Sequence, residues 1–465
     1  MCAVRSSGGG VLVLVRKSLF KSVLLGLAAA ATAVSAQAKD LAPTPPMGWN
    51  SWDAYGLTIT ERQFRDNVGV LARKLKPFGW NYAVIDEGWF MKNPQDRPTP
   101  EKLVFVFDAN GRYIPDPVRF PSALRHGSNI GFAAIAASVH ARGLKFGIHI
   151  VRGIPRETVA KNLPVAGSAF RAQDAADTSD ACPWDPTNWG VRDNAAGQAW
   201  YDSLITQYAR WGVDYLKVDC ISDHPYKPAE IRMIHRAIAR SGRPIVLSLS
   251  PGPTAFNVAA EVASKAQLWR ISDDVWDVWT TRKDWPRGID EHFDQMARWA
   301  PLARPGSWPD ADMLPLGYLG PTPGYGDPRQ TLLTSDEQRS VMTLWAIARS
   351  PLILGANLTR LDPATLALLT NRTVIDIDQN GRDARQVNRD GSVVAWTSTG
   401  RTGKRYLALF NTADAPVEVR RDFAFYGLIG SYRVRDVWKN TAVDKQAVDA
   451  TLAPRGTLLL ELSHQ

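Results

Sequence analysis

The stretch Gly212-Val-Asp-Tyr-Leu-Lys-Val-Asp-Cys220 has the pattern of a short buried strand that ends in a carboxylate. Because side chains alternate along a strand, Lys217 and Asp219 share one face while Leu216 and Val218 fill the other. Buried charges are costly unless they are paired, so this face suits a partly solvated strand end better than a core. Two interpretations follow: a structural ion pair that closes the strand, or half of a functional site.

The strand belongs to a repeating pattern. Between about residues 43 and 356, short apolar runs alternate with amphipathic stretches, which is typical of repeated strand-helix units. Helices are predicted at 61–75, 131–141, 195–211, 228–240 and 336–348. Strands are predicted at 47–52, 82–86, 144–150, 213–219, 245–250, 268–272, around 312–316 and at 352–355. Eight strands with intervening helices predict an α/β fold, a (β/α)8 TIM barrel.

After Asn371 the pattern changes to alternating strands with hairpin signals such as Asn380-Gly381 and Asp390-Gly391. This predicts a C-terminal antiparallel β-sandwich domain. It carries no convergent set of titratable residues, so we interpret it as a packing domain, with glycan binding as the alternative. The predicted boundaries are a leader at 1–38, the catalytic barrel at 39–370 and the sandwich at 371–465.

Residues 1–38 have the pattern of a signal peptide: a basic start, an apolar run at 22–34 and small residues at Ala36-Gln-Ala38. The chain is therefore predicted to be secreted or periplasmic. A membrane anchor is the alternative, but the apolar run is shorter than the roughly 20 residues a bilayer needs, so we expect no membrane contact after cleavage. Without the leader's four positive charges, the formal net charge of +9 falls to +5. The remaining Lys and Arg are scattered, so we expect no nucleic-acid partner.

Three cysteines occur, of which Cys2 lies in the leader, leaving Cys182 and Cys220. Two cysteines in an exported chain suggest one disulfide, with two unpaired buried thiols as the alternative. Their spacing does not fit a zinc site, and the seven histidines form no His-x-x-x-His pair. We predict no metal and no cofactor. The sequence gives no signal of oligomeric state.

In a (β/α)8 barrel the active site lies at the carboxyl ends of the strands. Those ends are rich in carboxylates, cations and indoles, which together suit carbohydrate binding. The residues concerned are Trp49, Asn50, Trp52, Asp53, Asp86, Glu87, Trp89, His149, Arg152, Lys217, Asp219, Ser248, Ser250, Arg270, Asp273, Asp274, Asp310, Asp312 and Met313.

Two of these carboxylates fit glycoside cleavage with retention, which needs a nucleophile and an acid/base about 5 Å apart. Asp219 is the candidate nucleophile, because Lys217 nearby would keep it ionised. Asp274 is the candidate acid/base, because alternation places it on the same side as Arg270 while Asp273 points away. The alternative for the acidic doublet is a helix cap or turn.

The chain resembles glycoside hydrolase family 27, the family of α-galactosidases (melibiases) and α-N-acetylgalactosaminidases. The resemblance implies a barrel followed by a β-sandwich, a double-displacement retaining mechanism, and no cofactor or metal. It covers about residues 43–380 in order. The motifs that carry it are Thr44-Pro-Pro-Met-Gly-Trp-Asn-Ser-Trp52, Ile85-Asp-Glu-Gly-Trp89, Gly143-Leu-Lys-Phe-Gly-Ile148, Trp211 to Asp219, Trp269-Arg-Ile-Ser-Asp-Asp274, Trp308-Pro-Asp-Ala-Asp-Met313 and Leu344-Trp-Ala-Ile-Ala-Arg-Ser-Pro-Leu352.

By this resemblance, Asp219 would be the nucleophile and Asp274 the acid/base, and Cys182 would pair with Cys220. The residues that would bind the sugar are Trp52 on the ring, Asp86 and Glu87 at the C4 and C6 hydroxyls, Lys217 and Arg270 at other hydroxyls, and Met313 along the wall.

Three positions depart from the family pattern, namely Glu87 in place of an aspartate, His149 in place of a tyrosine, and Ser250 in place of a bulkier acidic motif. We expect an exo-glycosidase that removes terminal α-D-galactosyl residues. Because Glu87 could occupy the space of the C6 group and Ser250 could admit a 2-substituent, β-L-arabinopyranosidase and α-N-acetylgalactosaminidase are the alternatives. A glycan-binding protein on an inactive barrel is the non-enzymatic alternative. A barrel enzyme acting on phosphorylated substrates is disfavoured because prolines interrupt the glycine-rich segment 317–324.

Overall fold

The computed structural model describes residues 41–465 apart from 98, 282 and 321–324. The predicted signal peptide, residues 1–38, lies outside the described residues. None of the helices in the described ranges combines the length and the apolar character that a bilayer-spanning segment needs.

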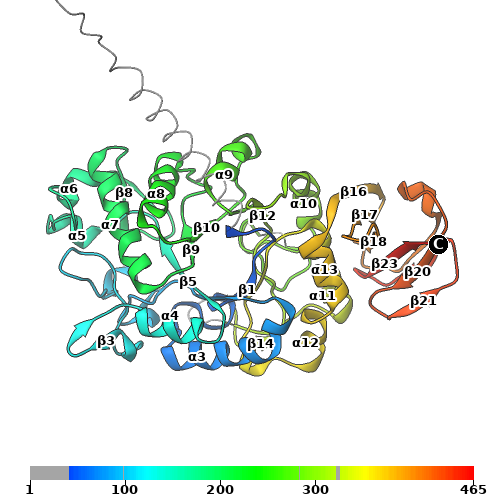
Figure 1. The fold of residues 1–465 in the computed structure, drawn as a ribbon, viewed down its shortest axis with the longest axis horizontal. Helices are drawn as coiled ribbons and strands as arrows, with labels where there is room; N and C mark the ends of the chain where they lie inside the picture. Colours follow the sequence, from blue (N-terminus) through cyan, green and yellow to red (C-terminus); the bar gives the residue numbers. More distant parts are fainter. Residues whose placement is uncertain (1–40, 98, 282, 321–324) are drawn as a thin grey trace, which may run out of the picture.

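Eight parallel strands form the predicted barrel (Figure 1). Consecutive strands pair in parallel, and the ring closes where Leu314 N donates to Ile353 O at 2.7 Å and Leu314 bridges Leu354. The fold prediction is therefore confirmed. In spatial order the strands are β12 (Trp308–Asp310), β11 (Leu268–Arg270), β10 (Val246–Leu249), β9 (Tyr215–Asp219), β5 (Lys145–Val151), β2 (Tyr82–Ile85), β1 (Met47–Asn50) and β15 (Leu352–Leu354).

The seventh strand differs from its predicted position around 312–316. It lies at Trp308–Asp310, and the chain then bends at Asp312, whose φ is +81°. The Asp310 carboxylate accepts the Asp312 amide at 3.0 Å and stabilises this bend. Pro315 has no amide hydrogen to give to a ladder, so Leu314 alone rejoins the sheet.

Helices follow most strands and surround the sheet (Figure 1). Helix α7 occupies its predicted range and ends at Gly212, whose φ of +85° turns the chain into β9. Capping boxes at Thr60 and Thr334 start α3 and α11. The main helices are α3 (Glu61–Val70), α4 (Ala133–His140), α7 (Ala195–Trp211), α8 (Pro228–Ser241), α9 (Ala259–Lys265), α10 (His292–Trp299) and α11 (Ser335–Ala348).

Shorter elements fill the loops at the carboxyl ends of the strands. The longest insertion follows β5 and builds a three-stranded sheet in the order β6, β8, β7. The short elements are α2 (Trp52–Tyr55), β3 (Leu124–Arg125), β4 (Ser128–Asn129), β6 (Ile154–Pro155), α5 (Arg156–Ala160), α6 (Ala172–Ala175), β7 (Ala176–Ala181), β8 (Asn188–Val191), β13 (Tyr318–Leu319) and β14 (Arg329–Gln330).

Most of the tryptophans belong to the core. Their rings are buried, and several of their indole nitrogens donate to backbone carbonyls, as Trp49 does to Ala356 O at 2.7 Å and Trp345 does to Asp312 O at 3.0 Å. Buried indoles that find a hydrogen-bond acceptor add packing area without an unsatisfied donor. These hydrogen bonds thus connect parts of the barrel that are distant in the sequence.

The C-terminal domain is an antiparallel β-sandwich, as predicted, but its first strand begins later than expected. Helix α12 (Pro363–Leu369) is followed by α13 (Arg372–Asn380), which Asn371 caps and which packs against α11. Apolar residues at Val374, Ile375 and Ile377 give this segment a buried helical face. One sheet contains β16 (Arg382–Asp390), β17 (Val393–Thr399), β18 (Arg405–Asn411), β23 (Thr457–His464), β20 (Tyr432–Asp436) and β21 (Thr441–Val443), and the other contains β19 (Val417–Asp422) and β22 (Ala447–Leu452).

Candidate active site

Lys217 on β9 and Asp86 at the end of β2 form an ion pair past the intervening strand β5. The Lys217 Nζ lies 3.0 Å from Asp86 Oδ2, at the end of β2, and Asn50 Nδ2 donates to the same oxygen at 2.6 Å. Burial raises the pKa of Asp86, but the charge of Lys217 and the donors around the carboxylate outweigh it, so this pKa lies well below its ordinary value. Asp86 is therefore a buried carboxylate that stays ionised. Lys217 bonds to Asp86 rather than to Asp219, the neighbour with which it shares a strand.

Asp219 lies at the end of β9 and contacts the end of β5. Its Oδ2 is 3.4 Å from His149 Nε2, and its Oδ1 accepts the Cys220 amide at 2.6 Å. Burial raises the pKa of Asp219, but the contacts with His149, Lys217 and the Cys220 amide outweigh it, so this pKa lies below its ordinary value. The side chain is 20% exposed. Asp219 is an ionised carboxylate that a ligand can reach.

The turn that follows Asp219 is fixed from two sides. Cys220 has a φ of +61° and forms a disulfide with Cys182, which confirms the predicted pairing. Arg152 is buried and donates its Nε to Cys220 O at 2.6 Å, while its other nitrogens bind Asp180 and Glu230 at 2.8–3.0 Å. A buried guanidinium that is ion-paired with two carboxylates is held in a fixed position. Arg152 therefore positions the backbone that carries Asp219.

Ser250 supports the same turn through its backbone. Its amide donates to Val218 O at 2.9 Å, and its carbonyl accepts the Ile221 amide at 3.2 Å. The Ser250 side chain is buried next to this turn. A small residue therefore stands at the end of β10, beside Asp219.

A second cluster gathers around Arg270 at the end of β11. Its Nη2 donates to Asp274 Oδ1 at 3.3 Å, and its Nη1 lies 2.7 Å from Asp312 Oδ1. The Asp273 carboxylate accepts the Asp274 amide at 2.9 Å, so Asp273 caps the turn while Asp274 faces Arg270. Asp274 is 36% exposed. Arg270 Nε is buried and has no hydrogen-bond acceptor among the described residues.

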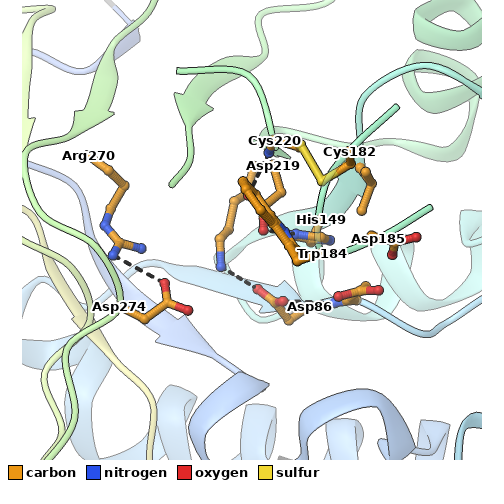
Figure 2. A network of polar contacts seen from close by, with 12 residues as sticks. Asp86, His149, Cys182, Trp184, Asp185, Asp219, Cys220, Arg270 and Asp274 are labelled. Atoms are coloured by element: carbon orange, nitrogen blue, oxygen red, sulfur yellow. Dashed lines mark hydrogen bonds and ion pairs between the residues drawn. A yellow bond between two sulfur atoms is a disulfide. The ribbon is translucent and has the colours of Figure 1, made fainter. Parts of the chain in front are cut away.

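The two clusters face the same space. Figure 2 shows Arg270 and Asp274 on one side, and Asp219, His149 and the disulfide on the other. The charge of Arg270 opposes the rise that Asp86 and Asp219 cause in the pKa of Lys217, which requires the clusters to be close. One site therefore contains two accessible carboxylates, the buried Arg270 and the partly buried Lys217.

Glu87 is buried beside this site in an acidic neighbourhood. Its Oε1 has no hydrogen-bond partner in the described part of the chain and lies 4.0 Å from Arg97 Nη2. Arg97 Nη1 donates to Asp185 Oδ2 at 3.2 Å. Burial and the charge of Asp185 raise the pKa of Glu87 well above its ordinary value, while Arg97 opposes them.

Two family models match the chain. One, described as "Alpha galactosidase A", matches residues 194–380, and one described as "Alpha galactosidase C-terminal beta sandwich domain" matches residues 390–462. The chain is 41% identical to a GH27 β-L-arabinopyranosidase from Geobacillus stearothermophilus of known structure. The similarity covers 92% of this chain and 98% of that one, with a TM-score of 0.85.

The chain belongs to glycoside hydrolase family 27.

Other relatives are similar to this chain over most of their length. A Bacillus halodurans protein assigned as an α-N-acetylgalactosaminidase is 38% identical, with 90% and 97% of the two chains covered and a TM-score of 0.80. Alpha-galactosidase 2 of Arabidopsis thaliana is 26% identical, with 91% of each chain covered. The relatives thus differ in the sugars that they are named for. The resemblance drawn from the sequence motifs is confirmed, and the chain is a glycoside hydrolase that acts on carbohydrate.

The two remaining sugar-site candidates lie beside residues of this family 27 site. Trp52 begins α2, is half-buried, and donates its amide to Asn50 Oδ1 at 2.8 Å. Met313 is buried directly after Asp312. Among the residues that the structure describes, no three His, Cys, Asp or Glu side chains are arranged to hold a metal ion.

Several functional candidates were not singled out from the sequence. Arg97 and Asp185 lie in loops without periodicity, but Asp185 follows Cys182 by three residues. Because Cys182 pairs with the residue after Asp219, the loop after Cys182 must lie at the site. The disulfide was therefore the signal that could have located Asp185.

Asp53 is a buried carboxyl behind the site. Its Oδ2 has no hydrogen-bond partner among the described residues. Burial, followed by the charge of Asp312, raises the pKa of Asp53 well above its ordinary value. Gly355 lies against it, because a Cβ added there would be 1.9 Å from Asp53 Oδ2.

His292 supports the end of β11 and gives this hydrolase a pH-sensitive element. Its ring stacks on Trp345 with centroids 5.1 Å apart, and its Nε2 lies 2.9 Å from Ser272 Oγ. Burial lowers the pKa of His292 to about 4. Unfolded histidine titrates near about 6.5, so the unfolded state binds more protons between these values. The stability from neutral His292 is complete above that unfolded pKa and is lost as the pH falls through the folded pKa.

We expect the free energy of unfolding to fall by on the order of 3 kcal/mol, from this group alone, as the pH drops across that window. Chemical denaturation of wild type and His292→Gln at several pH values measures this change. The free energy of unfolding should depend less steeply on pH in the variant than in wild type. His126→Gln, which alters an exposed histidine, is the matched control and should keep the wild-type slope. Equal slopes for wild type and His292→Gln would contradict the prediction.

Proposed function

We propose that this family 27 hydrolase is a retaining exo-glycosidase that removes terminal β-L-arabinopyranosyl residues from glycans. β-L-Arabinopyranose is α-D-galactopyranose without the C6 hydroxymethyl group. The observation that carries the proposal is Glu87, a buried carboxyl next to Asp86 and longer by one methylene than the aspartate usual in α-galactosidases. Its extra length would fill the space that the C6 group of galactose needs. The 41% identity to a β-L-arabinopyranosidase supports the same choice.

In the proposed reaction the ionised Asp219 attacks the anomeric carbon. The bond to the leaving oxygen breaks, and Asp274 gives that oxygen its proton. In the second step Asp274 takes a proton from water, the water oxygen attacks the anomeric carbon, and the bond to Asp219 breaks. Two displacements leave the sugar with its original anomeric configuration.

The other residues would hold the sugar ring for these steps. Asp86 is ionised and would accept a hydrogen bond from the C4 hydroxyl. The partly buried Lys217 Nζ and the Arg270 guanidinium would donate to other hydroxyls. Trp52 would pack on the apolar face of the ring. His149 would border the sugar beside Asp219, and Met313 would line the wall.

Two other substrates are weighed against this one. Terminal α-D-galactosides are the second candidate, because the matching barrel model and many relatives carry the α-galactosidase name. A terminal α-N-acetylgalactosaminide is favoured by the small Ser250 at the end of β10 and by the 38% identity to a protein assigned as an α-N-acetylgalactosaminidase. We expect both to be slower substrates than β-L-arabinopyranosides.

We also propose that the enzyme is secreted or periplasmic. The leader-like residues 1–38 motivate this proposal, and the Cys182–Cys220 disulfide supports it, because structural disulfides persist in oxidising compartments. N-terminal sequencing of the mature protein, purified from its source, tests it. A mature chain that begins near residue 39 is expected, and an intact leader would contradict the proposal.

Replacing Glu87 with aspartate is expected to shift the preference from arabinopyranoside toward galactoside by about tenfold or more, since one methylene is worth roughly 10–200-fold in discrimination. The measurement is kcat/KM for aryl β-L-arabinopyranoside and aryl α-D-galactopyranoside. Glu87→Gln is the matched control: it keeps the length of the side chain, so the preference should survive even if activity falls. An unchanged ratio in Glu87→Asp would show that Glu87 does not select the sugar.

A further inference from the structure

Trp285 lies directly against the candidate acid/base. Its indole Nε1 donates to Asp274 Oδ2 at 3.2 Å, on the oxygen that Arg270 leaves free. Despite this contact, the residue is 44% exposed. Large aromatic side chains are normally buried in this chain. An exposed indole beside a reacting group therefore indicates a surface on which a ligand packs.

A second aromatic residue supports Trp285 from the side. Tyr325 lies 5.3 Å from it, ring centroid to ring centroid, at an interplanar angle of 90°. Tyr325 in turn lies 4.9 Å from the buried Trp276, and the Arg329 guanidinium lies 5.6 Å from its ring centre. This chain of contacts holds the indole in place without burying it.

The exposed tryptophans are not scattered over the surface. In the part of the chain that the structure describes, the exposed tryptophans are Trp184 and Trp285. Trp184 is next to Asp185, beside Glu87, and Figure 2 shows it on the side of Asp219 and His149. Trp285 is on the opposite side, with Asp274. The two therefore flank the same site.

The position of Trp285 beside Asp274 indicates which part of the substrate it would contact. An acid/base stands between the sugar that is transferred and the leaving group, because it protonates the oxygen that joins them. A side chain that touches the acid/base and faces solvent is therefore on the side of the leaving group. Flat aromatic surfaces pack on the apolar faces of pyranose rings, and the electron-rich indole is the strongest of them.

We propose that Trp285, supported by Tyr325, is the binding platform for the first sugar ring of the leaving group. This inference rests on the proposed retaining glycosidase function and extends it. The ligand class is a pyranose that carries the terminal sugar, so the enzyme would select oligosaccharides over glycosides with small leaving groups.

The test compares two substrates that share the terminal sugar and differ in the leaving group. One is the fastest of a panel of β-L-arabinopyranosyl glucoses linked to O2, O3, O4 or O6, and the other is β-L-arabinopyranosyl fluoride, which carries no second ring. Trp285→Ala is expected to lower kcat/KM by about tenfold on the disaccharide, in the range of one lost ring contact. On the fluoride, the same variant should stay within about twofold of wild type.

Two further variants separate the roles of the indole. Trp285→Phe keeps a flat ring but loses the N–H that bonds to Asp274, and we expect it to retain most of the disaccharide activity. Phe425→Ala removes an exposed aromatic side chain in the C-terminal domain and is the control, expected to match wild type on both substrates.

Three outcomes would overturn the inference. They are equal losses on disaccharide and fluoride in Trp285→Ala, a Trp285→Phe variant as impaired as Trp285→Ala, and a wild type that cleaves the fluoride but none of the disaccharides. A wild type that does not cleave the fluoride would instead refute the proposed arabinopyranosidase function. Melibiose and α-D-galactosyl fluoride would then replace the two substrates, and the same comparison would still test the platform.

Discussion

The Asp219→Asn variant is expected to lose about 10⁴-fold or more in kcat/KM, because the amide keeps the shape of the side chain but cannot attack the anomeric carbon. The structure explains why the native carboxylate is suited to this attack. Its pKa is held below the ordinary value by His149, Lys217 and the Cys220 amide in spite of burial. The measurement is kcat/KM on β-L-arabinopyranosyl fluoride, with thermal unfolding as a check on folding.

The nature of the defect can be tested separately with Asp219→Gly and added azide. Azide would enter the space of the missing carboxylate and give an arabinopyranosyl azide of inverted configuration, identifiable by NMR. Asp193→Asn, which alters an exposed carboxylate, is the control and should keep wild-type turnover. Near-full activity in Asp219→Asn would mean that the nucleophile has been assigned to the wrong residue.

The second large effect is expected for Asp274→Ala, and its size should depend on the leaving group. General acid catalysis contributes roughly 10²–10⁴-fold, so the loss should lie in this range for the disaccharide. For the first step on a dinitrophenyl glycoside, whose leaving group needs no proton, the loss should be far smaller. Pre-steady-state release of dinitrophenol measures this step directly.

Added azide distinguishes this variant from Asp219→Gly. In Asp274→Ala the glycosyl-enzyme still forms, so azide should give a product of retained configuration. Asp273→Asn is the matched control, since Asp273 accepts the Asp274 amide rather than facing Arg270. If Asp274→Ala loses the same factor on both leaving groups, Asp274 is not the acid.

The elements that were predictable from the sequence are those whose local pattern agrees with their tertiary environment. Helix α7 occupies 195–211 as predicted, because Asn194 caps its start and Gly212 ends it. The strand pattern predicted after Asn371 begins only at Arg382, because Asn371 caps a further helix at 372–380. The end of the seventh strand depends on a carboxylate that bonds to the backbone two residues later. The periodicity of apolar residues cannot predict that hydrogen bond.

The residues of the site also divide into those that local sequence patterns predict and those that they do not. Lys217, Asp219, Arg270 and Asp274 were accessible to sequence reasoning, because strand alternation and strand ends place them. The partner of Lys217 was not, because it depends on β5 lying between β9 and β2. Trp285 was not accessible either, because its loop carries no periodicity and its position is set by contacts with Tyr325 and Asp274. Residues on regular elements could thus be named in advance, and residues on loops could not.

Gly355 and Asp53 limit the sequences that this barrel can accept. Any side chain at 355 would begin 1.9 Å from Asp53 Oδ2 and 2.6 Å from its Cβ, so rotating the carboxyl away would not relieve the overlap. Position 355 can therefore change only together with position 53, and the partner change would have to be to glycine. The two positions lie some 300 residues apart in the chain, yet the residue allowed at 355 depends on the residue at 53. A library that varies position 355 alone is expected to return few folded members, whereas position 53 can be varied against Gly355.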